Sequence, residues 1–454
     1  MRVAVLGAGV TGLAAAWKLA SGGHEVRVLE ALPRIGGVVH SEATDGWLIE
    51  RGPISFQESR PEITATIRDL GLAAERIETG PLAENRYIAR GGSLKALPAA
   101  SSVTSFLSTP LLSMRSKLAV AGEATRKPLR RTEDVSVAEL VRDHFTRDIL
   151  ETLVQPLIGG MYAGDAEKLS LQYAFPRIWA AERETGSLVK AAAEASRRRK
   201  AEGLPSPPPL ISFRRGLQAL PAALAARLPD GALVLGAEVK SAIRERGRSW
   251  KVGYVRAGKA AAYACDAVIS ALPAWSLARL ELGTAGRHPL ESLAGIAYAP
   301  VASLFFGYRR ERVSHPLDGF GALVPPNEQR SALGVVFISS LFPDRAPAGH
   351  VALNVFAGGT LQPALAALGK AELVERVGAD LRDLVGADGP PAFASHTLWP
   401  RAIPQYNLGY GRHLDAMARC EADHPGFLVG GCIRDGISLP ECLLAGLRLA
   451  ERAS

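Results

Sequence analysis

A G-x-G-x-x-G loop near the N-terminus is the strongest chemical signal in the sequence. Its members are Gly7, Ala8, Gly9, Val10, Thr11 and Gly12. Such a loop carries no nucleophile or acid–base group; it brings backbone N–H groups to the pyrophosphate of a dinucleotide. We expect Gly7 to make the tight turn, Gly9 to leave room for the phosphates, and Gly12 to let a helix and a strand pack closely.

A carboxylate follows the loop at the distance that a ribose contact requires. Glu30 lies 18 residues after Gly12 and ends an apolar stretch. We expect it to accept a hydrogen bond from the adenosine ribose, and an acid there favours a 2′-hydroxyl over a 2′-phosphate. The surrounding pattern fits, because it predicts a strand over 2–6, a helix over 13–20 and a second strand over 25–30.

Hydrolytic and metal chemistry find no support in the sequence. It contains no H-E-x-x-H, G-x-S-x-G or Walker A motif and no cysteine–histidine cluster at ligand spacing, so we expect no metal site. His40 and His144 are isolated and are expected to be ordinary surface or core side chains. The difficult chemistry is therefore assigned to a bound cofactor.

A second glycine pair separates FAD from NAD as the expected cofactor. After Glu30 come Arg34, Gly36 and Gly37, and this E-x-x-x-R-x-G-G pattern resembles the FAD-binding start of the amine oxidase superfamily. The resemblance implies non-covalently bound FAD. Two short strands are then expected over 38–41 and 47–50, joined by a turn at Asp45-Gly46.

Further motifs extend the resemblance over nearly the whole chain. The run Gly52-Pro53-Ile54-Ser55-Phe56 resembles the protoporphyrinogen oxidases, although that family usually has a polar residue where this chain has Ile54. Residues 159–165 (GGMYAGD), 399–410 (WPRAIPQYNLGY) and 427–442 are similar to other family signatures. The resemblance implies cofactor contacts at Gly52, Pro53, Ile54, Ser55, Val239, Trp399, Ile437, Ser438 and Leu439.

The C-terminal helix and one arginine receive specific roles from this resemblance. A helix expected over 439–450 would point its positive N-terminal end at the N1/O2 edge of the flavin. Arg86 would hold a substrate carboxylate, and its ordinary alternative is a solvated strand arginine. The implied reaction is oxidation of protoporphyrinogen IX to protoporphyrin IX by hydride transfer to FAD, with O2 as acceptor. Coproporphyrinogen III oxidation and a non-catalytic porphyrin carrier are the alternatives.

Composition limits the remaining partners. The 454 residues are 47% hydrophobic and 22% charged, as in globular enzymes, and the net charge is +8. With 6% aromatic residues and no nucleic-acid motif, nucleic acid is not an expected partner. Neither a secretory signal nor an apolar run of spanning length is visible, so we expect a cytoplasmic protein.

The expected fold is α/β with α+β insertions: a two-dinucleotide-binding FAD fold with a helical insertion and a sheet-bearing substrate domain. The FAD domain is expected to be discontinuous over 1–90, 210–290 and 390–454, with a helical insertion over 91–209 and a substrate domain over 291–389. A membrane surface and a second copy of the chain are further candidate partners. The membrane hypothesis rests on an apolar stripe followed by basic residues: Leu111, Leu112, Met114, Leu118 and Val120, then Arg126, Lys127, Arg130 and Arg131.

Overall fold

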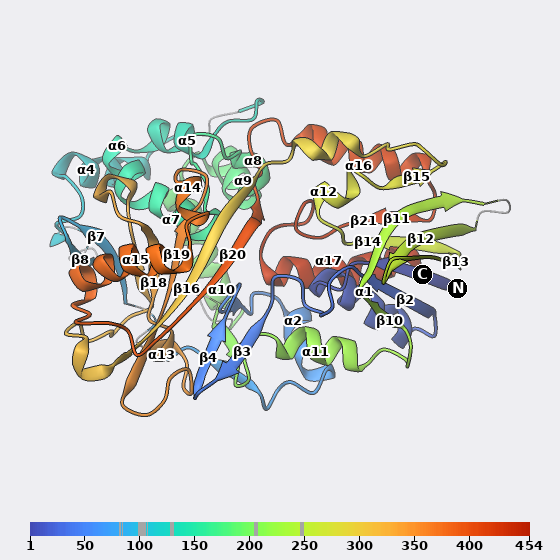
Figure 1. Cartoon of the computed structure of the whole chain (residues 1–454). Coiled ribbons are helices and arrows are strands. Elements are labelled where there is room, and N and C mark those ends of the chain that lie inside the picture. The colour runs from blue at the N-terminus through green and yellow to red at the C-terminus, as the bar shows by residue number, and fades with distance from the viewer. Residues whose placement is uncertain are drawn as a thin grey trace.

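The computed structural model describes residues 1–80, 83, 85–98, 106, 108–127, 131–203, 208–245 and 249–454. A five-stranded parallel sheet forms one end of the molecule (Figure 1), with the strand order β10-β2-β1-β14-β21. These strands come from three separate parts of the chain, as a discontinuous dinucleotide-binding domain requires. Their bounds are β1 Arg2–Leu6, β2 Glu25–Glu30, β10 Leu233–Leu235, β14 Ala267–Ser270 and β21 Phe427–Val429.

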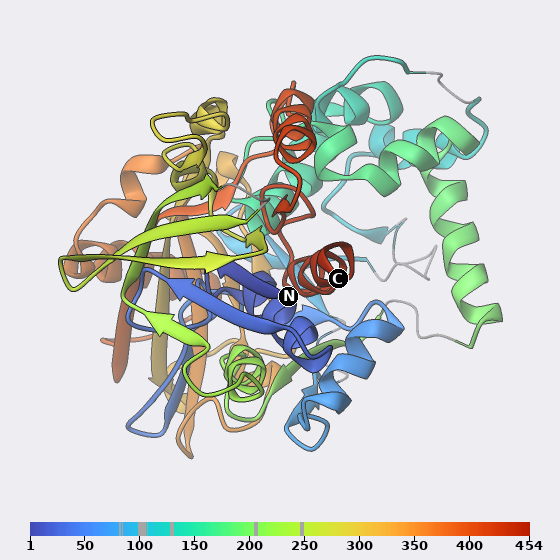
Figure 2. The same cartoon turned by 90° about the vertical axis from the view of Figure 1, so that its right-hand side faces the viewer.

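Two helices from opposite ends of the chain pack together beside this sheet. They are α1 (Val10–Ser21) and α17 (Leu439–Ala453). The contact is close because Gly446 faces α1: a Cβ at that position would lie 2.3 Å from the carbonyl oxygen of Thr11. The C-terminal helix is therefore part of the dinucleotide domain (Figure 2).

Smaller sheets complete this end of the molecule. An antiparallel meander is flanked by a parallel strand in the order β13-β12-β11-β15, and a three-stranded sheet has the order β5-β9-β6. The expected hairpin at Asp45-Gly46 is confirmed, but its first strand covers 41–44 and not 38–41. The bounds are β3 Ser41–Thr44, β4 Trp47–Glu50, β5 Phe56–Gln57, α2 Pro61–Asp69, β6 Arg76–Glu78, β9 Leu210–Phe213, α11 Ala219–Ala226, β11 Ala237–Arg244, β12 Trp250–Arg256, β13 Lys259–Cys265, α12 Ala274–Leu277 and β15 Glu281–Gly283.

A seven-stranded mixed sheet forms the other end, in the order β20-β16-β19-β18-β17-β7-β8. Two of its strands, β16 and β20, run back toward the dinucleotide domain (Figure 1). The expected boundaries at residues 90 and 390 cut through this sheet, because β7 and β20 belong to it. The bounds are β7 Arg86–Arg90, β8 Ser93–Ala96, β16 Tyr298–Arg309, β17 Gly321–Leu323, β18 Ala332–Val336, α13 Ile338–Leu341, β19 His350–Gly358, α14 Pro363–Ala366, α15 Lys370–Val385, β20 Phe393–Pro404 and α16 Gly411–Asp423.

Helices dominate the expected insertion once β8 has ended. Its long outer helix α10 contains no buried residue and projects from the body (Figure 2). The expected apolar stripe is divided: Leu111 and Leu112 are buried, whereas Met114 and Leu118 are exposed. Arg130 lies outside the described residues, and membrane contact stays a prediction. The bounds are α4 Met114–Glu123, α5 Val137–His144, α6 Arg147–Ile149, α7 Gln155–Tyr162, α8 Leu171–Ala174, α9 Pro176–Thr185 and α10 Leu188–Ala201.

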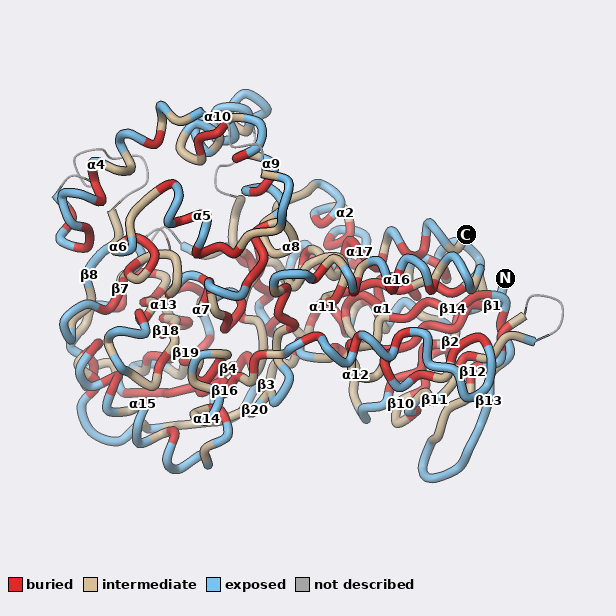
Figure 3. Tube along the Cα trace, turned by 90° about the horizontal axis from the view of Figure 1, so that it is seen from above, coloured by how far each residue is buried: buried red, intermediate tan, exposed pale blue. Residues whose placement is uncertain are grey.

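His144 is a core residue of this insertion, as expected for an isolated histidine. Its ring nitrogens lie 2.9 Å from Glu123 Oε1 and 3.0 Å from Glu182 Oε1, and all three side chains are buried. Arg131 adds two hydrogen bonds to Glu182. The network joins α4, α5 and α9, each of which has short buried stretches that Figure 3 shows in red. No helix in the described ranges is long and apolar enough to cross a bilayer.

Candidate flavin and substrate site

The three glycines of the first loop have distinct geometries. Gly7 has φ +97°, in the region that favours glycine. A Cβ on Gly12 would lie 1.9 Å from the carbonyl oxygen of Gly7, whereas a Cβ on Gly9 would meet no atom within 4 Å. The loop therefore needs Gly12 for its own packing and leaves open space at Gly9, as the sequence pattern predicts.

Glu30 and Arg34 lie beside this loop, but both make protein contacts. The Glu30 carboxylate accepts hydrogen bonds from the N–H groups of Ala8 (2.7 Å) and Leu32 (2.8 Å). It thereby links the end of β2 to the glycine turn that follows β1. Its remaining acceptor capacity is where a ribose contact would form. Arg34 donates to the carbonyl oxygen of Gly37 at 2.7 Å, and burial lowers the pKa of its guanidinium.

The second glycine pair contacts the first loop. Gly9 and Gly36 form an isolated parallel bridge, and Gly36 and Gly37 have φ values of +94° and +60°. A Cβ on Gly52 would lie 2.0 Å from the carbonyl oxygen of Val38, so the next segment is also tightly packed. The second glycine pair thus contacts Gly9, and the segment at Gly52 packs against Val38, the residue that follows this pair.

Trp399 contacts the segment that contains Gly52 and Pro53. Its Nε1 donates to the carbonyl oxygen of Arg51 at 2.7 Å, and Arg51 in turn donates to Thr397 Oγ1 at 2.7 Å. Ile54 is buried in an apolar cluster with Trp47 and Phe305, so its departure from the family pattern is accommodated by packing. Ser55, next to it, is partly exposed.

Val239 follows closely after the strand that pairs with the end of β2. It sits on β11 beside a bulge, four residues beyond Leu235, which pairs with Glu30 in the parallel sheet. The side chain is partly buried. The predicted cofactor contact of Val239 stays a prediction.

The first turn of α17 and the loop before it are held against the first loop by direct contacts. Thr11 Oγ1 donates to the carbonyl oxygen of Cys442 at 2.9 Å, and a Cβ on Gly431 would lie 3.3 Å from Thr11 Oγ1. Ser438 caps α17 by accepting from the N–H of Glu441. Within the described chain, the backbone N–H groups of Ile437, Ser438 and Leu439 have no protein acceptor.

The residues brought together here fit FAD. Open space at Gly9 suits a pyrophosphate, Glu30 suits a ribose, and the unpaired N–H groups at the start of α17 suit an electron-rich flavin edge. The cofactor contacts themselves stay predictions.

Arg86 and Trp399 lie on one face of the seven-stranded sheet. Residues that pair across neighbouring strands lie on the same side of a sheet, and so do alternate residues along one strand. From Arg86 these pairings run to Gly321, Val336, Asn354 and Phe305. Along β16 the same side continues from Phe305 to Val301, which pairs with Trp399. The opposite face is covered by α15 through an apolar cluster that includes Leu304, Leu373 and Val377. The middle of the first face is also covered, because Phe305 packs in an apolar cluster with Trp47 and Ile338. Arg86 and Trp399 lie at the two ends of this face.

Arg86 is available at its end of this face. Its side chain is exposed, and the guanidinium lies 5.3 Å from the centroid of the Phe320 ring. No carboxylate of the described residues pairs with it. Trp399 marks the other end of the face, beside Arg51 and Gly52.

Sequence reasoning missed two residues of this region. Tyr406 was within a recognised motif without a role; its hydroxyl donates to the carbonyl oxygen of Cys432 and accepts from the N–H of Gly436 at 3.1 Å. Glu50 is fully buried and binds Ser41 Oγ and the N–H of Leu217. Burial raises the pKa of Glu50 to about 7 despite these hydrogen bonds. A carboxylate ending the apolar stretch WLIE was the only available signal.

A parallel dinucleotide-binding sheet, a glycine-lined cradle and a second, larger sheet define a flavin-dependent oxidoreductase. The family model described as flavin containing amine oxidoreductase matches residues 10–454, and the chain belongs to that family.

Individual proteins of known activity are similar to this chain over nearly its whole length. The mitochondrial protoporphyrinogen oxidase of Nicotiana tabacum is 33% identical, over 99% of this chain and 94% of that protein. The coproporphyrinogen III oxidase of Bacillus subtilis (strain 168) is 25% identical, over 98% of this chain and 96% of that protein. A crystal structure from Exiguobacterium sp. 255-15 is 23% identical and covers 99% of this chain and 98% of its own, with a TM-score of 0.83. This last likeness establishes the fold.

Proposed function

We propose that this chain oxidises protoporphyrinogen IX to protoporphyrin IX, with non-covalently bound FAD and O2 as the terminal acceptor. The observation that carries the proposal is the shared sheet face of Arg86 and Trp399. A porphyrinogen is a large apolar macrocycle with carboxylate tails, so it needs an apolar surface and a cationic anchor away from the flavin.

The chain's own residues bind and orient this substrate. Arg86 holds one propionate through its guanidinium fork, and the sheet face supports the macrocycle. Trp399 is fixed by its hydrogen bond to Arg51 and limits how the ring system lies against the flavin. The start of α17 supplies N–H groups that stabilise negative charge on the N1/O2 edge.

When bound, FAD would supply the redox chemistry by accepting two electrons from the substrate in each round, and O2 would be reduced to H2O2. Three rounds remove six electrons and six protons from the macrocycle and consume three O2.

Coproporphyrinogen III is the second candidate substrate, supported by the Bacillus relative. It undergoes the same oxidation and carries four propionates, where protoporphyrinogen IX carries two. The exposed basic side chain at Arg86 could anchor either substrate.

The deciding experiment compares kcat/KM for both porphyrinogens on the same flavin-replete protein, followed by porphyrin fluorescence. The proposal predicts a higher value for protoporphyrinogen IX. A higher value for coproporphyrinogen III would assign the second activity instead.

A further inference from the structure

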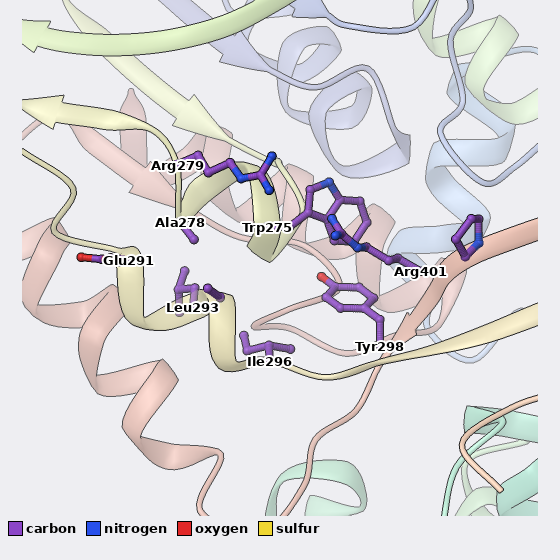
Figure 4. A pocket seen from close by; sticks show the side chains of 10 residues that line it. Trp275, Ala278, Arg279, Glu291, Leu293, Ile296, Tyr298 and Arg401 are labelled. Carbon is purple, nitrogen blue, oxygen red and sulfur yellow. The ribbon is translucent and has the colours of Figure 1, made fainter. Parts of the chain in front are cut away.

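A pocket outside the residues assigned to flavin and substrate has a cavity of about 480 Å3 (Figure 4). It lies between α12, the short 3-10 helix Glu291–Gly295, the beginning of β16 and the end of β20. Its volume is within the range of small-molecule sites. Its lining residues are Trp275, Ala278, Arg279, Glu291, Leu293, Ala294, Ile296, Tyr298, Pro400 and Arg401.

Two aromatic rings form one wall of the pocket. The rings of Trp275 and Tyr298 meet edge to face with their centroids 4.7 Å apart. The guanidinium of Arg401 lies over Trp275, 5.1 Å from the ring centroid. A flat ring could stack against this wall, and the cation–π contact holds Arg401 in place at the pocket.

Hydrogen-bond donors outnumber acceptors around this wall. Arg279 and Arg401 extend toward Trp275 from opposite sides (Figure 4). In the part of the chain that the structure describes, neither guanidinium pairs with a carboxylate, and Trp275 Nε1 has no acceptor. The Tyr298 hydroxyl accepts from the N–H of Ala274 at 3.2 Å and keeps its own hydrogen to donate.

Glu291 is the only acidic side chain in the lining, and its carboxylate points away from these donors in Figure 4. Two unpaired guanidinium groups beside one distant carboxylate make the pocket positive. Such a site favours a ligand that accepts hydrogen bonds and carries negative charge.

We infer that this pocket binds a small planar aromatic anion, separately from the flavin and the porphyrinogen. The ring stacks against Trp275 and Tyr298, and the anionic group receives hydrogen bonds from Arg279 and Arg401. Carboxylates and phosphates both match the guanidinium fork, so the aromatic anion is the shared chemistry.

Isothermal titration of the FAD-saturated protein tests this inference with four probes. Indole-3-acetate and adenosine 5′-monophosphate represent the aromatic carboxylate and the aromatic phosphate, whereas indole and inorganic phosphate each lack one feature. At least one aromatic anion should bind, and at least about tenfold more tightly than either incomplete probe. Whichever of the two aromatic anions binds more tightly shows whether the pocket prefers a carboxylate or a phosphate.

Variants tie the binding to the pocket. Arg279→Ala and Arg401→Ala should each weaken it about tenfold, and Arg401→Lys should restore part of the loss because an ammonium lacks the planar fork. The matched control is Arg183→Ala, which removes another arginine that lies over a tryptophan, 5.9 Å from the ring centroid of Trp179. FAD content should stay constant. The inference is overturned if no aromatic anion binds, if an incomplete probe binds equally well, or if binding survives in both alanine variants.

Discussion

The hydroxyl of Tyr406 donates a hydrogen bond to the carbonyl oxygen of Cys432, 2.6 Å away. The hydroxyl oxygen of Tyr406 also accepts a hydrogen bond from the N–H of Gly436, so one side chain spans the loop that precedes α17. Gly436 has φ +120°, a conformation that a non-glycine residue rarely adopts. The buried tyrosine thus fixes the loop whose unpaired N–H groups are proposed to face the flavin.

Tyr406→Phe should loosen this loop and weaken FAD binding. Two hydrogen bonds of about 1 kcal/mol each correspond to a loss of roughly tenfold to thirtyfold in affinity. The flavin reduction potential should also fall, because donors to the reduced N1/O2 edge are less well placed. Fluorescence titration of the apoprotein and a redox-dye titration measure the two effects.

Tyr162→Phe is the matched control, since it removes one buried hydrogen bond, to the carbonyl oxygen of Ala174. Its FAD affinity and reduction potential should match those of the unmodified protein. Equal values in the Tyr406 variant would reduce Tyr406 to an ordinary core residue.

Gly9→Ala and Gly12→Ala should fail for different reasons. The new methyl group at Gly9 meets no protein atom, and the backbone there has φ −72°, so the apoprotein should fold normally yet lose most of its FAD affinity. The methyl group at Gly12 would overlap the Gly7 carbonyl, so that variant should be destabilised without FAD as well. Thermal unfolding of both apoproteins, with FAD titration, distinguishes them. Tight FAD binding by the Gly9 variant would contradict the proposed pyrophosphate position.

Arg86→Ala should chiefly raise KM, because a remote carboxylate anchor stabilises the ground state and the transition state nearly alike. Loss of a charge-assisted bond of roughly 1.5–3 kcal/mol corresponds to about a tenfold to hundredfold increase. Arg86→Lys should recover part of this loss. Steady-state kinetics on flavin-replete protein give the answer, and an unchanged KM in the alanine variant would return Arg86 to a surface role.

Glu50 should make the free energy of unfolding depend on pH. Its pKa is raised from 4.5 to about 7 in the folded state, chiefly by burial. Between those values the folded protein retains a proton that the unfolded chain releases, so this residue's contribution to stability decreases as pH rises from about 4.5 to 7. The loss is on the order of 3 kcal/mol at pH 8.

Glu50→Gln keeps an acceptor for Leu217 and removes the titration. The free energy of unfolding of the variant minus that of the unmodified protein should therefore be larger at pH 8 than at pH 5. Denaturant unfolding at both pH values measures this difference. A stability difference that is equal at pH 5 and pH 8 would show that Glu50 does not titrate in this range.

Local patterns predicted the conformation of the glycine loop well, because the turn at Gly7, the packing at Gly12 and the strand ending at Glu30 depend on near neighbours. Long-range pairing was less predictable. The strand of Arg86 was assigned to the FAD domain, although it pairs with Gly321 far along the chain. Tyr406 gave little signal for the same reason, because its partners are backbone groups of Cys432 and Gly436. Glu50 binds Ser41 in the neighbouring strand and the distant N–H of Leu217, and composition and periodicity reveal neither contact.

Anaerobic mixing of the purified yellow protein with protoporphyrinogen IX tests the central claim most directly. Acid precipitation first confirms that the flavin is FAD and is released without covalent attachment. The account predicts that substrate bleaches the flavin absorbance, and that O2 restores it while fluorescent protoporphyrin and H2O2 accumulate. Binding of the porphyrinogen without bleaching would contradict this account and indicate a porphyrin carrier.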